Sequence, residues 1–189
     1  MPEEIEVKVR VADPAAFSRR MLDRGLAPAG AVFESNRLFD TPDGRLGREG
    51  SALRLREERR PDDGAVLRTV LTFKGPRRPG PIKRRPEFET TVGQAAPAVA
   101  ILEGLGLAES FRYEKRRTTW HVGECEVVLD QVPRLGWFVE VEGPSEEAVL
   151  GQLADLGLGG EPLIGETYVH LLIDCLASLG LDPTWAVFE

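Results

Sequence analysis

The feature that most constrains this chain is a strict alternation of charged and aliphatic residues in several separate segments. Residues 4–11 read Glu-Ile-Glu-Val-Lys-Val-Arg-Val, and 52–57 alternate in the same way. A period of two residues is typical of a β-strand with one apolar and one polar face. Further strands are expected at 31–39, 66–74, 87–89, 113–122, 126–130 and 137–142. The chain therefore predicts about eight strands.

Helices are expected between these strands. Asp13-Pro14 supplies an N-cap with proline at the first helical position, and Gly25 ends that helix. Three more helices are predicted at 97–105, 145–156 and 167–179, and the Gly- and Pro-rich stretch 75–86 is predicted to be a loop. We expect an α+β protein with one largely antiparallel sheet, which could close into a β-barrel and so leave no free edge. A length of 189 residues favours a single domain over 1–189.

Composition excludes several classes of function. A formal net charge of −7 argues against nucleic acid or an anionic membrane as the main partner. No secretory leader opens the sequence and no apolar run approaches the ~20 residues of a membrane span, so a cytoplasmic location is expected. His121 and His170 fall in no zinc-binding pattern, and Cys125 and Cys175 are too far apart to form a disulfide framework.

The charges on the predicted strands occur in pairs of one sign. Residues two apart in a strand point the same way. The pairs are Glu4 and Glu6, Arg54 and Arg56, Glu87 and Glu89, Lys115 and Arg117, and Glu140 and Glu142. Each pair alone is compatible with a solvated outer face. Facing inward together, they would surround a cavity in which cations bind a polyanion and carboxylates bind a hard divalent metal. That combination indicates metal-assisted phosphoryl or nucleotidyl transfer.

Several motifs in order give the chain a recognisable likeness. They are the ExExK of residues 4–8, the LRLR of 53–56, the TFKGP of 72–76, the ExE of 87–89, the KRR of 115–117, the LGWFVEVE of 135–142 and the TYVHLL of 167–172. This series resembles the CYTH family, the triphosphate tunnel metalloenzymes. The resemblance implies a closed antiparallel β-barrel of about eight strands, flanked by helices, around a triphosphate-binding tunnel.

The resemblance also implies roles for individual residues. The triphosphate-binding residues would be Lys8, Arg54, Arg56, Lys74, Lys115 and Arg117. The metal ligands would be Glu4, Glu6, Glu140 and Glu142, with Asp130, Glu87 and Glu89 as weaker candidates. Lys8, Glu6 and Glu140 would be the catalytic residues. Arg10, Arg37 and Lys83 are weaker candidates for triphosphate binding, for which a surface position is at least as good an interpretation, and Arg116 should point outward.

The activity implied by the resemblance is metal-dependent processing of a small-molecule triphosphate with Mg²⁺ or Mn²⁺. The TFKGP and LGWFVE segments look more like the class IV adenylyl cyclase branch, which forms cyclic AMP and pyrophosphate from ATP. Hydrolysis of thiamine triphosphate or inorganic tripolyphosphate is the first alternative. A non-catalytic polyphosphate- or nucleotide-binding module is an alternative of another class, and a plain structural barrel is a third. A homodimer is compatible with the family.

Overall fold

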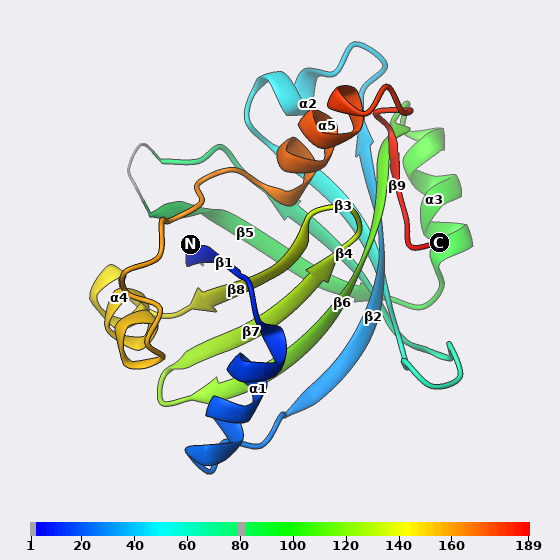
Figure 1. Ribbon diagram of the computed structural model, residues 1–189. Helices are drawn as coiled ribbons and strands as arrows, with labels where there is room; N and C mark the ends of the chain where they lie inside the picture. The colour runs from blue at the N-terminus through cyan, green and yellow to red at the C-terminus, as the bar shows by residue number, and fades with distance from the viewer. Residues whose placement is uncertain (1–2, 79–81) are drawn as a thin grey trace.

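The computed structural model describes residues 3–78 and 82–189. Eight antiparallel strands in these residues follow one another around a barrel in the order β2-β3-β4-β5-β1-β8-β7-β6, and β6 then pairs with β2 to close it. The strands are β1 (Glu3–Val11), β2 (Gly30–Asp40), β3 (Ala52–Arg59), β4 (Val66–Lys74), β5 (Lys83–Val92), β6 (Ala108–Val122), β7 (Cys125–Val132) and β8 (Gly136–Glu142). The predicted α+β fold with a closed antiparallel barrel is confirmed (Figure 1).

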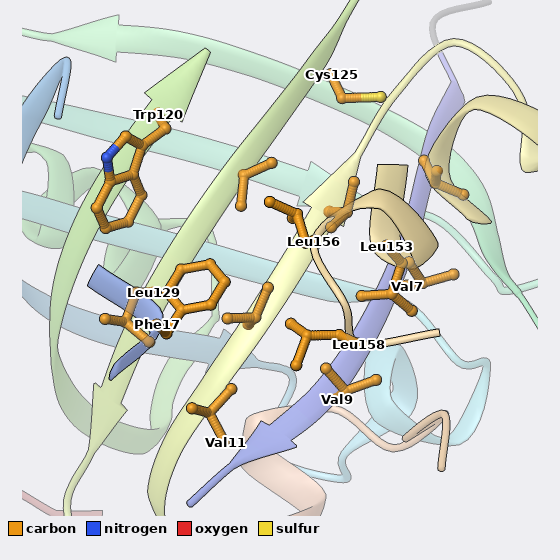
Figure 2. Packing of buried hydrophobic residues seen from close by; sticks show 14 of the residues in the cluster. Val7, Val9, Val11, Phe17, Trp120, Cys125, Leu129, Leu153, Leu156 and Leu158 are labelled. Atoms are coloured by element: carbon orange, nitrogen blue, oxygen red, sulfur yellow. The ribbon is translucent and has the colours of Figure 1, made fainter. Parts of the chain in front are cut away.

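The apolar residues of the alternating strands face outward and are covered by helices. Val7 and Val9 of β1 pack with helices α1 (Pro14–Asp23) and α4 (Glu146–Asp155) in one buried cluster (Figure 2). Fully burying such an aliphatic side chain stabilises the fold by about 1.5–3 kcal/mol. This cluster fixes which face of β1 points out, so the charged residues of β1 point into the barrel.

The helices begin where the sequence predicts caps. The Asp13 carboxylate accepts a hydrogen bond from the Ala16 amide at 2.8 Å, and the Ser145 hydroxyl accepts one from the Ala148 amide at 3.1 Å. Helix α3 (Ala95–Gly104) packs against Leu55 on the outside of β3. These three helices leave the ends of the barrel uncovered, and a fourth helix occupies one of them (Figure 1).

Helix α5 (Tyr168–Ser178) lies at one end of the barrel, close to the single-turn helix α2 (Arg45–Arg48) (Figure 1). Its buried residues Tyr168 and Leu172 pack against Phe111 and Phe138 in a second apolar cluster. The rings of Phe138 and Tyr168 meet edge to face at 5.2 Å between centroids. Helix α5 therefore closes this end with an apolar contact and places Tyr168 beside the interior.

Four details differ from the sequence prediction, and the first is that β6 begins at Ala108 rather than 113. Strand β5 begins at Lys83 rather than 87, since residues 83–86 of the expected loop pair with β1, in the register Glu6 to Lys83 and Glu4 to Arg85. The Gly and Pro residues of this stretch predicted a loop, whereas ion pairs with distant residues of β1 stabilise a strand there. Residues 79–81 of the expected loop lie outside the described residues. Helix α2 and the short strand β9 (Trp185–Ala186), which pairs with β6, were not predicted.

The described helices include none that is both long and apolar enough to cross a membrane.

Candidate active site

The barrel encloses a cavity of about 1460 Å³ that is lined by side chains from all eight strands and α5. Every residue predicted to bind the triphosphate lines it: Lys8, Arg54, Arg56, Lys74, Lys115 and Arg117. Of the predicted metal ligands, Glu4, Glu6, Glu87, Glu89, Glu140 and Glu142 line it and Asp130 does not. Charges from strands far apart in the sequence are thus brought to one enclosed space.

One side of the cavity is built from four cations, Arg54 and Arg56 of β3 and Lys115 and Arg117 of β6, around Glu34 of β2; we call it the cation wall. Glu34 is 1% exposed, and its carboxylate lies 3.3 Å from Arg56 and 3.5 Å from Lys115. Burial alone would raise the pKa of Glu34, but Lys115, Arg56 and Arg117 outweigh it and hold that pKa far below its usual value. Glu34 is therefore a permanent anion that holds the cations together.

Arg54 is the least neutralised member of the cation wall. Its closest carboxylate, that of Glu89, lies 4.0 Å away, and its guanidinium donates to the Thr72 hydroxyl at 3.3 Å. Its Nε is buried and has no hydrogen-bond partner among the described residues. A buried donor without a partner costs free energy, which an anionic ligand in the cavity would recover.

The other side of the cavity carries Glu4 and Glu6 of β1 and Glu140 and Glu142 of β8; we call it the carboxylate wall. Glu4 is engaged by Lys74 at 2.8 Å, Arg85 at 2.9 Å and Lys83 at 3.5 Å. Burial opposes the ionised form, but Lys83, Lys74 and Arg85 bring the pKa of Glu4 far below its usual value. Lys83 is itself buried in this wall, so its surface alternative is wrong.

Glu140 is the second neutralised carboxylate of this wall. It faces Lys8 across the β1–β8 pair, with 3.4 Å between the charged groups, and accepts a hydrogen bond from Arg117 at 2.6 Å. Burial would raise the pKa of Glu140, yet Lys8 and Arg117 hold it well below the usual value. Arg117 thereby joins the two walls.

Glu6 and Glu142 are the carboxylates of the wall that repel one another. They are directly opposite in the register of β1 and β8. Burial and the nearby Glu140 raise the pKa of Glu6, although Lys83 lies 2.9 Å away. The Glu142 side chain keeps contact with solvent, but partial burial, Glu4 and Glu6 raise its pKa to about 7, and the described residues form no ion pair with it. This part of the wall carries more negative charge than its surroundings neutralise.

Glu6 and Glu142 have the oxygen ligands that a divalent metal ion prefers, but they do not by themselves form a metal site with three or more protein ligands. The described residues contain no group of three or more His, Cys, Asp or Glu side chains placed to hold a metal ion. Glu87 is bonded to Lys74 at 2.5 Å, and Glu89 lies 3.4 Å from Arg56. Glu6 and Glu142 remain the best-fitting donors for a hard divalent cation, because such a cation would remove their repulsion.

Asp130 and Tyr168 lie where β7 meets the start of α5. Asp130 is fully buried and accepts hydrogen bonds from Arg117 at 2.6 and 2.7 Å, from Lys115 at 3.1 Å and from the Tyr168 hydroxyl at 3.0 Å. Burial and the Asp130 charge raise the pKa of Tyr168 well above its usual value, so the phenol stays protonated and donates. The Lys8 ammonium lies 4.1 Å from the centre of the Tyr168 ring.

Three arginines lie away from the cavity. Arg10 is exposed, Arg37 pairs with Glu109 at 2.5 Å, and Arg116 is exposed and donates to Gln131 at 3.0 Å. The surface alternative therefore holds for Arg10 and Arg37. The residues that sequence reasoning missed are Glu34, Arg85 and the Tyr168 hydroxyl; Tyr168 stood in a recognised motif, but its bond to Asp130 had no local signal.

Comparison with known proteins agrees with this architecture. The family model described as the CYTH domain matches residues 2–154, so the chain belongs to the CYTH domain family. The chain is 29% identical over 192 residues to adenylate cyclase CyaB of Aeromonas hydrophila, an alignment that covers 95% of this chain and 92% of the relative.

Two solved structures share the fold. A Pyrococcus horikoshii protein has 25% identity and a TM-score of 0.77, and the match covers 90% of this chain and 98% of that one. A Hippeastrum protein, described as an adenylyl cyclase candidate with a dominant triphosphatase activity, has 21% identity and a TM-score of 0.67, and the match covers 95% of this chain and 97% of that one.

Proposed function

We propose that this protein binds a small-molecule triphosphate in its barrel together with a divalent cation, and that it is a class IV adenylyl cyclase-like enzyme that converts ATP to cyclic AMP and pyrophosphate. The observation that carries the proposal is the cation wall, above all the buried and incompletely partnered guanidinium of Arg54. Arg56, Lys115 and Arg117 each pair with more than one carboxylate, whereas Arg54 has no carboxylate nearer than 4.0 Å among the described residues and keeps donors for the phosphate oxygens of a polyanion.

In this proposal different residues of the cavity bind different parts of the substrate. Arg54, Arg56, Lys115 and Arg117 bind the phosphate chain and stabilise the negative charge that develops on it. Lys74, paired with Glu4 and Glu87, completes the cradle from β4. Lys8, beside Glu140, contributes a further positive charge at the reacting phosphorus.

Glu6 and Glu142, whose pKa values are raised by burial and by neighbouring carboxylates, would hold the divalent cation, Mg²⁺ or Mn²⁺. The other predicted ligands rank lower because the protein's own cations already engage them: Glu4, Glu87, Glu89, Asp130 and Glu140. When bound, such a cation supplies positive charge to phosphate oxygens and lowers the pKa of an attacking hydroxyl.

The cyclase reaction forms one bond and breaks one. The 3′ oxygen of the ribose attacks the α-phosphorus, the bond from that phosphorus to the bridging oxygen breaks, and pyrophosphate leaves with the electron pair. The hydroxyl proton passes to a cavity carboxylate.

The choice of cyclisation is supported by the Aeromonas hydrophila relative, which is named an adenylate cyclase. The alternative is hydrolysis of ATP, thiamine triphosphate or tripolyphosphate, in which water attacks the terminal phosphorus in the same cradle. A non-catalytic polyphosphate- or nucleotide-binding module fits less well, because an anion trap gains nothing from placing Glu6 and Glu142 beside the ligand.

A product assay tests the proposal. The protein is incubated with ATP, thiamine triphosphate or tripolyphosphate, with Mg²⁺, Mn²⁺ or a chelator, and the products are resolved. Cyclic AMP and pyrophosphate that form only with metal are the expected result. Orthophosphate would select the hydrolase, and binding without turnover would select the binding module. Protein carrying Glu6→Gln, purified in the same way, controls for contaminating phosphatases.

The remaining predictions are consistent with this function and stay predictions. They are a single domain over 1–189, a cytoplasmic location, no nucleic-acid or membrane partner, and a homodimer.

A further inference from the structure

The Tyr168 hydroxyl donates to a buried carboxylate that the proposed chemistry leaves without a clear role. Asp130 is 0% exposed and does not line the cavity. Its Oδ2 accepts from Tyr168, Lys115 and Arg117, and its Oδ1 accepts from Arg117. Because this carboxylate already accepts four hydrogen bonds and lies outside the cavity lining, it is badly placed to bind a metal ion in the cavity. Asp130 therefore acts on its neighbours rather than on a cation in the cavity.

The start of α5 is fastened to the same group of residues. The Ile164 amide donates to the Lys8 carbonyl at 2.8 Å, and the Lys8 ammonium donates to the Glu166 carbonyl at 3.0 Å. The Tyr168 ring lies against Lys8 on one side and Phe138 on the other. The phenol is thus held by packing, and its hydroxyl is aimed at Asp130.

We infer that Tyr168 is a positioning residue that acts through Asp130 to fix Lys115 and Arg117 in the places where they meet the phosphate chain. The inference rests on the proposed triphosphate binding. Its physical basis is competition for Lys115, whose ammonium lies 3.1 Å from Asp130 and 3.5 Å from Glu34. The hydroxyl occupies one side of Oδ2 and so fixes the rotation of the carboxylate.

Without the hydroxyl, Asp130 is held only by Arg117 and Lys115, the two cations that it positions, and Lys115 is free to move toward Glu34. The two cations would then have to rearrange before they bind phosphate oxygens. Groups that are already in place avoid this cost, which is why preorganised donors bind and stabilise charge best.

The test is the affinity of inorganic tripolyphosphate, measured by calorimetry at fixed ionic strength for the full chain and for Tyr168→Phe. This change removes one oxygen and keeps the ring against Phe138 and Lys8. We expect binding to weaken about tenfold, as for the loss of a hydrogen bond to a charged group, with little change in melting temperature. Measurements in two further backgrounds, Lys115→Met and Arg54→Ala, show which residues Tyr168 acts through.

In the Lys115→Met background, Tyr168→Phe should cost less than about threefold, because part of what Tyr168 positions has been removed. In the Arg54→Ala background the loss should remain about tenfold, because neither Tyr168 nor Asp130 bonds to Arg54. Equal losses in both backgrounds, together with a lower melting temperature, would indicate a general packing role and overturn the inference.

Unchanged affinity in Tyr168→Phe would overturn this inference alone and leave the proposed function intact. A parent protein that binds no triphosphate would overturn both.

Discussion

The two walls of the cavity are built in the same way and differ in how completely their charges are matched. In the cation wall, Glu34 lies within 3.8 Å of Arg56, Lys115 and Arg117, and its pKa is held far below the usual value. In the carboxylate wall, Glu6 and Glu142 face one another and both have raised pKa values. The first wall is organised before any ligand arrives, and the second is short of positive charge.

Because of this difference, a polyanion and a divalent cation would bind to the two walls in different ways. A polyanion meets cations that are already fixed, so little rearrangement is needed. A divalent cation meets a pair of carboxylates whose repulsion it removes, so metal binding would stabilise the folded protein. The predictions below test each wall separately, beginning with the largest expected effect.

Glu34→Gln should destabilise the folded protein by leaving the cations of the cation wall without their shared carboxylate. Removing one partner of a buried charge cluster leaves uncompensated charges and costs about 3 kcal/mol or more. For a chain of this length that lowers the melting temperature by about 10 °C. Thermal unfolding followed by circular dichroism measures the change.

The matched control is Glu57→Gln on the same sheet, where the partly exposed pair with Arg59 should contribute less than about 1 kcal/mol. Equal losses in the two variants would show that the cation wall does not depend on Glu34.

Glu6→Gln, in the carboxylate wall, should lower the activity of the protein without lowering its stability. We expect turnover of the triphosphate to fall about 100-fold or more, as when an electrostatic group of an active site is removed. The melting temperature without metal should stay level or rise, because a repelling carboxylate is gone. Glu3→Gln on the same strand, whose carboxylate pairs with Arg84 outside the cavity, should keep full activity. Full activity in Glu6→Gln would remove Glu6 from the site.

Arg54→Ala should weaken substrate binding without unfolding the protein. The closest carboxylate to Arg54, that of Glu89 at 4.0 Å, also pairs with Arg56 at 3.4 Å, so the loss of Arg54 leaves no buried anion unpaired. We expect the KM for the triphosphate to rise about tenfold to 30-fold, as for the loss of a charge-assisted contact. Arg116→Ala, on the exposed face of β6, is the control and should leave KM unchanged. An unchanged KM and kcat in Arg54→Ala would place the binding site elsewhere.

Glu142→Gln should have a smaller effect that depends on pH. The folded-state pKa of about 7 lies above the usual 4.5, so this group favours the folded state most below pH 4.5, and that contribution is lost as pH rises through 7. At pH 8 without metal the variant should therefore be the more stable by about 1 kcal/mol, since screening of an exposed side chain reduces the full effect. At pH 4.5 the two should melt together.

Added Mg²⁺ extends this comparison. At pH 8 it should raise the melting temperature of the parent more than that of Glu142→Gln. Equal stabilisation of both proteins would mean that Glu142 does not meet the metal.

Much of this architecture could be predicted from local pattern. The alternation in β1 and β3 fixes strand type and facing, because a shift by one residue would turn every inward charge toward the helices and every aliphatic side chain into the cavity. Asp13 and Ser145 predict helix starts through their caps. The paired charges Arg54 with Arg56 and Glu140 with Glu142 predict an interior site, since like charges two residues apart need opposite charges nearby.

The missed residues are those whose role depends on distant partners. Glu34 stands alone in β2, and only closure of β2 onto β6 brings Lys115 and Arg117 to it. Arg85 lies in a Gly- and Pro-rich stretch, where only pairing with β1 reveals a strand. Tyr168 meets Asp130 across 38 residues of sequence through the docking of α5. Local periodicity carries no information about such contacts.

The central claim is that the cation wall is fixed in place to bind a polyanion, while Glu6 and Glu142 on the opposite wall are incompletely neutralised and suited to a divalent cation. A crystal structure with tripolyphosphate and Mn²⁺ tests it most directly, because the anomalous signal locates the metal independently of the phosphate. We expect the phosphate chain between Arg54 and Arg117 and a manganese peak beside Glu6 and Glu142. Phosphate and metal bound together on the outer surface, with the cavity residues unchanged, would contradict the account.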